Sequence, residues 1–154
     1  MADNFVTNAG SGGSTFAADD ISSIFYPRVK RSFGRDGVVA DAGTLSRLIS
    51  AASTNATSVK ASAGTVYAIH AVNLNAAVRY LKLYNKASSP TVGTDTPVAT
   101  FPIPASATGA GFVINLDPGA DFATGIALAL TTGSADADTG AVAASEIFVH
   151  LVYV

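Results

Sequence analysis

The chain has 154 residues, of which only 13% are charged, and it contains no cysteine. This length is enough for one domain with a buried core, and the lack of cysteine excludes disulfides, thiolate metal sites and cysteine nucleophiles. The net charge is −2, and the charges are unevenly distributed: residues 21–86 contain all nine basic residues, and the charged residues in 87–154 are all acidic. This distribution suits either charge-complementary packing or two solvated regions.

Residues 1–43 lack the pattern of a folded core. The opening sequence MADNFVTNAGSGGSTFAADD has neither the basic start nor the apolar run of a secretory signal. No apolar run reaches the length of a membrane span, so we expect a soluble protein. Isolated apolar residues and the flexible GSGG spacer predict an extended N-terminal arm, with a short hairpin that turns at residues 34–37.

A basic cluster lies inside this arm, in the stretch YPRVKRSFGRDG, and aromatic residues flank it. Basic and aromatic side chains together can bind nucleic acid. The whole chain is acidic, however, with a pI of about 5.5, so we prefer an acidic protein surface as the partner, contacted by bidentate arginines. The candidate partner-binding residues are Phe25, Tyr26, Arg28, Lys30, Arg31, Phe33 and Arg35.

Residues 44–154 predict an all-β domain. Short segments rich in β-branched and aromatic residues alternate with Gly, Pro, Asn and Asp at roughly 10-residue spacing, which is typical of a β-sandwich or jelly roll of about eight strands. Residues 45–52 also fit a short helical face, but Ser, Thr and Asn follow at once, and we prefer a strand. The predicted strands are 47–53, 58–62, 64–74, 78–87, 98–104, 111–116, 125–132 and 145–154.

Two of these strands have patterns that predict how they are buried. In residues 64–74, Val66, Ala68 and His70 share one face with Val72 and Leu74, while Tyr67, Ile69 and Ala71 share the other. In residues 78–87, two leucines alternate with Tyr and Lys, which predicts a half-buried strand.

No motif predicts catalysis, a metal or a cofactor. His70 and His150 lie mid-strand without the converging ligands that zinc needs, so we expect packed or surface histidines. In residues 136–146 the glycine and the glutamate each stand one position early for a calcium loop. A strand-connecting loop is the preferred interpretation there, and calcium the alternative. No nucleophile elbow or phosphate loop is present, and we expect no enzymatic activity and no cofactor.

Two parts of the chain resemble a known family. FAADDISSIFYPRVKRSFGRDG (16–37) resembles an N-terminal module of small structural proteins from tailed bacteriophages. TNATSVKASAGTVYAIHAVNLNAAVRYLKLYNKASSPTVGTDTPVATFPIP (54–104) and GIALALTTGSADADTGAVAASEIFVHLVYV (125–154) resemble the β-sandwich of the same proteins. One departure is Phe25, where that module commonly has a histidine.

The resemblance implies a virion structural component made in the host bacterial cytoplasm, with no catalytic residues. Our leading hypothesis is a capsid decoration, or cement, protein on the head surface, whose partner is the major capsid protein. Its sandwich (44–154) is expected to form a homo-oligomer, preferably a trimer, while its arm (1–43) bridges capsid subunits. The alternative is a tail, fibre or neck component that binds carbohydrate, which the lack of tryptophan disfavours. Neither hypothesis includes a membrane or nucleic-acid partner.

Overall fold

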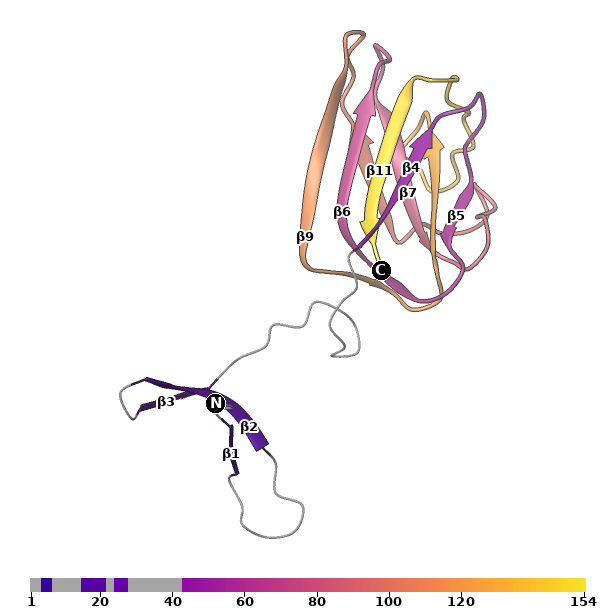
Figure 1. Ribbon diagram of the computed structural model, residues 1–154. Helices are drawn as coiled ribbons and strands as arrows, with labels where there is room; N and C mark the ends of the chain where they lie inside the picture. Colours follow the sequence, from indigo (N-terminus) through magenta and orange to yellow (C-terminus); the bar gives the residue numbers. More distant parts are fainter. Residues whose placement is uncertain (1–3, 7–14, 22–23, 28–42) are drawn as a thin grey trace. The chain divides into compact units, whose positions relative to one another are not determined.

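The computed structural model describes residues 4–6, 15–21, 24–27 and 43–154, and the chain divides into two units, Met1–Ser32 and Phe33–Val154 (Figure 1). The first unit contains three short antiparallel strands in the order β1-β2-β3. Sequence analysis did not predict these strands, which are β1 (Asn4–Val6), β2 (Thr15–Ile21) and β3 (Ile24–Pro27). The hairpin expected at residues 34–37 lies outside the described residues.

In its described part, residues 43–154, the second unit is all-β and consists of two four-stranded antiparallel sheets that form a β-sandwich (Figure 1). One sheet has the order β5-β10-β7-β8 and the other the order β4-β11-β6-β9. Within the described residues no helix is long and apolar enough to cross a membrane. The strands are β4 (Thr44–Ile49), β5 (Thr57–Lys60), β6 (Gly64–Asn73), β7 (Arg79–Asn85), β8 (Ala99–Ile103), β9 (Ala110–Phe122), β10 (Ile126–Thr131) and β11 (Ile147–Tyr153).

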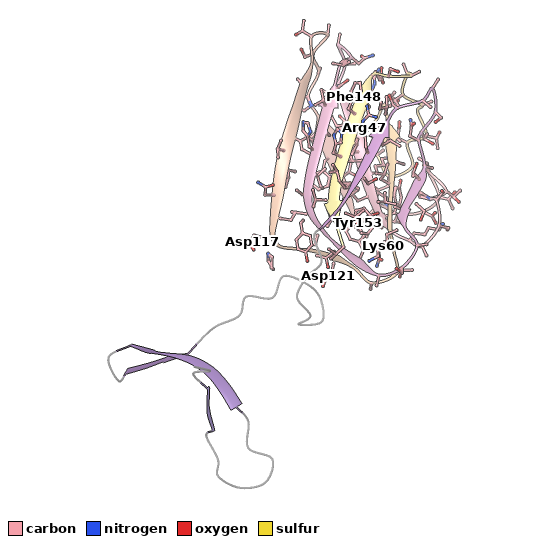
Figure 2. All side chains as sticks on the ribbon, in the orientation of Figure 1. Arg47, Lys60, Asp117, Asp121, Phe148 and Tyr153 are labelled. Carbon is pink, nitrogen blue, oxygen red and sulfur yellow. The ribbon has the colours of Figure 1, made fainter. Side chains whose placement is uncertain are left out.

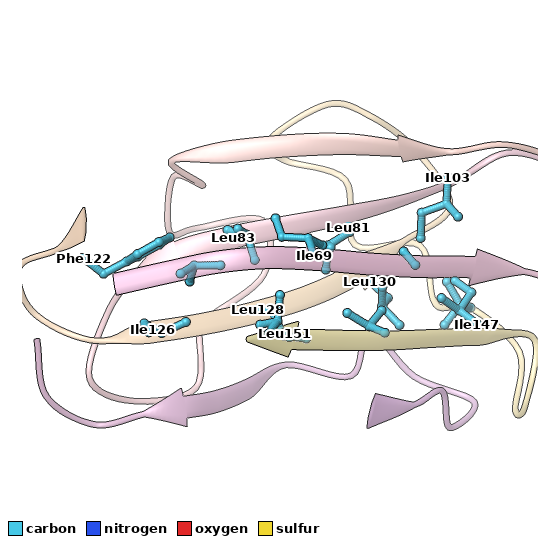
Figure 3. Close-up of a cluster of buried hydrophobic side chains, with 14 residues drawn as sticks. Ile69, Leu81, Leu83, Ile103, Phe122, Ile126, Leu128, Leu130, Ile147 and Leu151 are labelled. Carbon is cyan, nitrogen blue, oxygen red and sulfur yellow. The ribbon is translucent and has the colours of Figure 1, made fainter. Parts of the chain in front are cut away.

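The core lies between the two sheets and consists of aliphatic side chains from alternate positions of the inner strands (Figure 3). Leu81 and Leu83 of β7 and Leu128 and Leu130 of β10 meet Ile69 of β6, and all of them are essentially inaccessible to solvent. Burying side chains of this size contributes about 1.5–3 kcal/mol each. In β7 the period-two pattern of the sequence placed Leu81 and Leu83 on the same side, and that side points into the core.

All eight strands predicted for this unit are present, and two of them have ends that differ from the prediction by more than two residues. The predicted strand 47–53 is β4, Thr44–Ile49, because the chain turns after it: Asn55 accepts a hydrogen bond from the Ala51 amide and donates one to the Ala51 carbonyl. No helix forms at residues 45–52. The predicted strand 111–116 continues to Phe122 in β9, since Gly119 adopts a φ of 120° that lets the strand bend rather than end.

The alternation predicted for β6 holds only for part of the strand. Ile69 and Ala71 point into the core and His70 points outward, as the pattern requires. Val66 is also buried, although the pattern placed it with His70. The pairing of β6 with β9 shifts register between Val66 and Ala68, and a bulge of this kind exchanges the two faces of a strand.

The expectation that β7 is half-buried is wrong, because both of its faces are buried. Leu81 and Leu83 face the opposite sheet, while Lys82 and Tyr84 on the other side are only 0% and 1% exposed. Connecting segments cover this outer side: Val92 packs against the cluster that contains Tyr84, and the residue 132–140 loop contacts Lys82. The local periodicity of the sequence does not show that distant segments cover this strand.

Candidate functional site

Of the residues predicted to bind a partner, two lie in a described element. Phe25 and Tyr26 belong to β3, where they pair with Asp20 and Asp19 of β2. The other predicted residues, Arg28, Lys30, Arg31, Phe33 and Arg35, lie outside the described residues. Their role in partner binding therefore remains a prediction.

The two outer faces of the sandwich differ in how far connecting segments cover them. On the β5-β10-β7-β8 sheet, the outward side chains of Tyr84, Ala127 and Ala129 form a second buried cluster beneath connecting segments. On the β4-β11-β6-β9 sheet, by contrast, outward-pointing Leu45 and Val113 are 65% and 66% exposed. Among residues 43–154, one face is thus covered by connecting segments, and the other is exposed.

Lys82 fixes the loop that covers the first face. Its ammonium group donates hydrogen bonds to the carbonyl oxygens of Ala135, at 2.6 Å, and of Asp138, at 3.3 Å. The Asp138 carboxylate in turn accepts hydrogen bonds from the backbone amides of Gly133 and Gly140. The ammonium group therefore occupies the position that a bound cation would take among converging carbonyl oxygens.

The segment weighed as a calcium loop is the same loop, and it connects β10 to β11 as preferred. Within residues 136–146 the Asp138 carbonyl accepts a hydrogen bond from Lys82, as does the carbonyl of the preceding residue, Ala135. Glu146 lies at the other end of the segment in an ion pair with Arg79. In the described part of the chain, no three His, Asp or Glu side chains are placed to share a metal ion.

We call the open surface the β4–β9 face. Strand pairing places its residues in rows across all four strands, so that Arg47, His150, His70 and Val113 lie side by side in the central row. Figure 2 labels Arg47 and Phe148 on adjacent strands of this sheet. The face consists of Leu45, Arg47 and Ile49 of β4, Phe148, His150 and Val152 of β11, Ala68, His70 and Val72 of β6, and Gly111, Val113 and Asn115 of β9.

The centre of this face is a pair of stacked histidines. His70 and His150 are directly opposite each other on β6 and β11, with ring centroids 5.6 Å apart and ring planes inclined by 13°. The Nδ1 atom of His150 is buried and has no hydrogen-bond partner among the described residues. His70 is exposed and His150 half-buried.

A shallow hollow of about 350 Å³ lies around the histidine pair. Its walls are mainly aliphatic: Leu45, Ala68, Val113 and Val152 contribute side chains from all four strands. Exposed apolar surface that spans several strands is typical of a protein interaction site. This geometry suits packing against another flat apolar surface.

Comparisons of the chain with protein-family models, with curated proteins and with solved structures found no match. The evidence that the β4–β9 face is functional is therefore its geometry alone.

The sequence does not reveal this face, although both histidines are conspicuous in it. The alternation in 64–74 placed His70 with Ala68 and Val72, which was correct. It did not show that β6 lies beside β11, which brings His150 and His70 together across 80 residues of sequence. The signal that was present is the apolar character of both faces of residues 145–154, since a half-solvated strand alternates with polar residues.

Proposed function

We propose that this chain is a virion structural protein of a tailed bacteriophage, a capsid decoration (cement) protein that binds the outer surface of the assembled head. The observation that carries the proposal is the contrast between the covered face of the sandwich and the exposed apolar β4–β9 face. A surface of this kind suits a protein that works by packing against other proteins. The resemblance of residues 16–37, 54–104 and 125–154 to phage structural proteins supplies the biological setting.

The strand order supports a jelly-roll connectivity for the sandwich. Numbered from β4 as the first strand, the two sheets run 1-8-3-6 and 2-7-4-5, which is the order of two interleaved Greek keys of eight strands. Jelly rolls occur in viral capsid proteins and also in lectins. A fold alone does not decide between these roles, so the carbohydrate-binding tail component stays as the alternative.

In the proposed arrangement the N-terminal arm contacts capsid subunits and the sandwich forms the oligomer, a trimer. Phe25, Tyr26 and Phe33 would bury apolar area, and the basic residues from Arg28 to Arg35 would orient the arm on acidic capsid surface. Because the protein binds the assembled shell and not its separated subunits, binding stabilises the shell by mass action. This role needs no catalytic group and no cofactor.

The deciding measurement is the number of copies of this chain per virion relative to the major capsid protein, by quantitative mass spectrometry. A ratio near that of the capsid protein is the expected result. A ratio of a few per cent would contradict a shell-wide cement and favour the tail or neck alternative. In that case, binding of the sandwich to a glycan array would support adsorption.

A second test concerns the arm. A chain lacking residues 1–43 is expected to keep the circular dichroism spectrum of a folded sandwich and to lose binding to capsids in a sedimentation assay. In the full-length chain, Arg28→Glu is expected to weaken capsid binding, whereas Lys60→Glu on the sandwich, which changes the net charge by the same amount, serves as the charge-matched control. Full capsid binding by the shortened chain would contradict the role given to the arm.

A further inference from the structure

The β4–β9 face has the character of an inner sheet surface rather than an outer one. Three of its aliphatic residues are β-branched: Val72, Val113 and Val152 alternate with inward-facing core residues on three adjacent strands. Two sheets pack face to face about 10 Å apart when both present surfaces of this kind. Side chains on a solvated sheet face are usually polar, so this surface is suited to a protein occupant.

The charges at the two edges of the face indicate which kind of protein binds there. Arg47 is exposed on the edge strand β4, and Asp117 is exposed on the opposite edge strand β9, on the outward side of that strand. Between them, the interior strands β11 and β6 present apolar side chains and the two histidines. One edge is therefore basic and the other acidic, so the surface is complementary in charge to a copy of itself.

We infer that the β4–β9 face is the surface through which copies of this chain associate, with the β4 edge of one copy beside the β9 edge of the next. This inference rests on the proposed function and names the surface that makes its oligomer. A contact between two different edges is head-to-tail. It closes into a ring when a whole number of copies completes one full turn around the axis. A ring of three copies satisfies both edges of every copy.

The strand register adds a geometric requirement. Arg47 lies in the row of Val113, and Asp117 lies four residues further along β9, which corresponds to about 13 Å of strand. The strands of each copy must therefore be inclined to the ring axis for Arg47 to meet Asp117 of its neighbour. The His70–His150 pairs of the copies would then face one another near the axis.

The test is the oligomeric state of the full-length purified chain, measured by analytical ultracentrifugation in the absence of capsids. Wild type is expected to be a closed oligomer and Val113→Asp a monomer at the same concentration. Val98→Asp is the matched control, because Val98 is 58% exposed and lies outside the face; it is expected to remain oligomeric. Leu45→Asp provides a second variant on the face, and thermal melts followed by circular dichroism verify that each variant folds.

A charge exchange tests the pairing of the edges. Arg47→Asp is expected to raise the dissociation constant of the oligomer about tenfold or more, and adding Asp117→Arg to the same chain is expected to recover most of that loss. A double variant as defective as the single one would overturn the edge pairing. A monomeric wild type, or a folded Val113→Asp chain that stays oligomeric, would overturn the inference as a whole.

The outcomes separate this inference from the proposed function. A chain that is monomeric in solution yet present on virions at the copy number of the capsid protein refutes the self-association surface and leaves the cement function standing. An oligomer that depends on Val113 but occurs at low copy number supports the surface and contradicts the shell-wide function.

Discussion

The ammonium group of Lys82 lies 2.6 Å from the carbonyl oxygen of Ala135, which is 53 residues further along the chain. Lys82 is fully buried on the outer side of β7, and its hydrogen bonds join the sheet to the residue 132–140 loop. A buried ammonium group is stable only when hydrogen-bond acceptors surround it. This contact therefore explains how one outer face of the sandwich is closed.

Replacing Lys82 with methionine is expected to lower the free energy of unfolding by about 2–3 kcal/mol, because the carbonyl groups of Ala135 and Asp138 lose their donor. Methionine keeps most of the aliphatic stem, so lost packing contributes little. Urea denaturation measures the change, and Lys60→Met on the edge strand β5 is the matched control. A Lys82→Met chain as stable as wild type would show that the ammonium group does not hold the loop.

Addition of calcium is expected to leave the melting temperature of the wild-type chain unchanged. The backbone oxygens that converge in the 132–140 loop bind Lys82, and the Asp138 carboxylate binds two backbone amides. A ligand that binds the folded state raises its stability with ligand concentration. Differential scanning calorimetry with calcium or with a chelator makes the measurement, and a calcium-dependent rise would restore the calcium-loop interpretation.

The strands could be predicted from the sequence because each carries its own local signal. Segments 125–132 and 145–154 are short, apolar and preceded by turn residues, and both are strands in the structure near the predicted positions. The bulge in β6 and the extension of β9 were not predictable, since they depend on how these two strands pair with each other. The three strands of the first unit were also missed, because their apolar residues, next to the flexible GSGG spacer, were interpreted as isolated contacts of an extended arm.

The candidate site was harder to predict than the fold. The basic cluster at residues 28–35 is conspicuous in the sequence and was predicted to bind a partner. The β4–β9 face combines residues from Leu45 to Val152, and it exists only once β4, β11, β6 and β9 are placed side by side. Burial of Lys82 likewise depends on a loop more than fifty residues away. Both features arise from topology rather than from any local pattern.

Ser50→Ala is expected to destabilise the sandwich by about 1–3 kcal/mol, because it leaves buried backbone groups without partners. The Ser50 hydroxyl donates to the Ala143 carbonyl at 2.8 Å and accepts from the amides of Glu146 and Ile147 at 3.1 and 3.0 Å. Denaturant titration of Ser50→Ala beside the exposed Ser62→Ala control measures the effect. Equal stability of the two variants would mean that water replaces the hydroxyl.

Glu146 is the single glutamate of the chain, and it lies just before β11 and connects this position to Asn75 and to Arg79, the first residue of β7. Its carboxylate accepts hydrogen bonds of 2.7 Å from Arg79 Nε and from Asn75 Nδ2, and its side chain is 7% exposed. Burial alone raises the pKa of Glu146. The hydrogen bonds from Arg79, the Ala143 backbone and Asn75, together with the charge of Arg79, outweigh burial and lower this pKa below its ordinary value of 4.5.

A carboxyl group whose pKa is lowered by folding stabilises the folded state above its ordinary pKa, and that stabilisation is lost as the pH falls through the lowered value. Glu146→Gln is therefore expected to reduce the free energy of unfolding at pH 7 by about 1–3 kcal/mol, since Arg79 loses its anionic partner. Below about pH 4 the difference from wild type is expected to shrink. Urea titrations across this pH range measure it, with exposed Asp136→Asn as the matched carboxyl-to-amide control. A difference that stays constant with pH would show that the effect of Glu146 is steric rather than ionic.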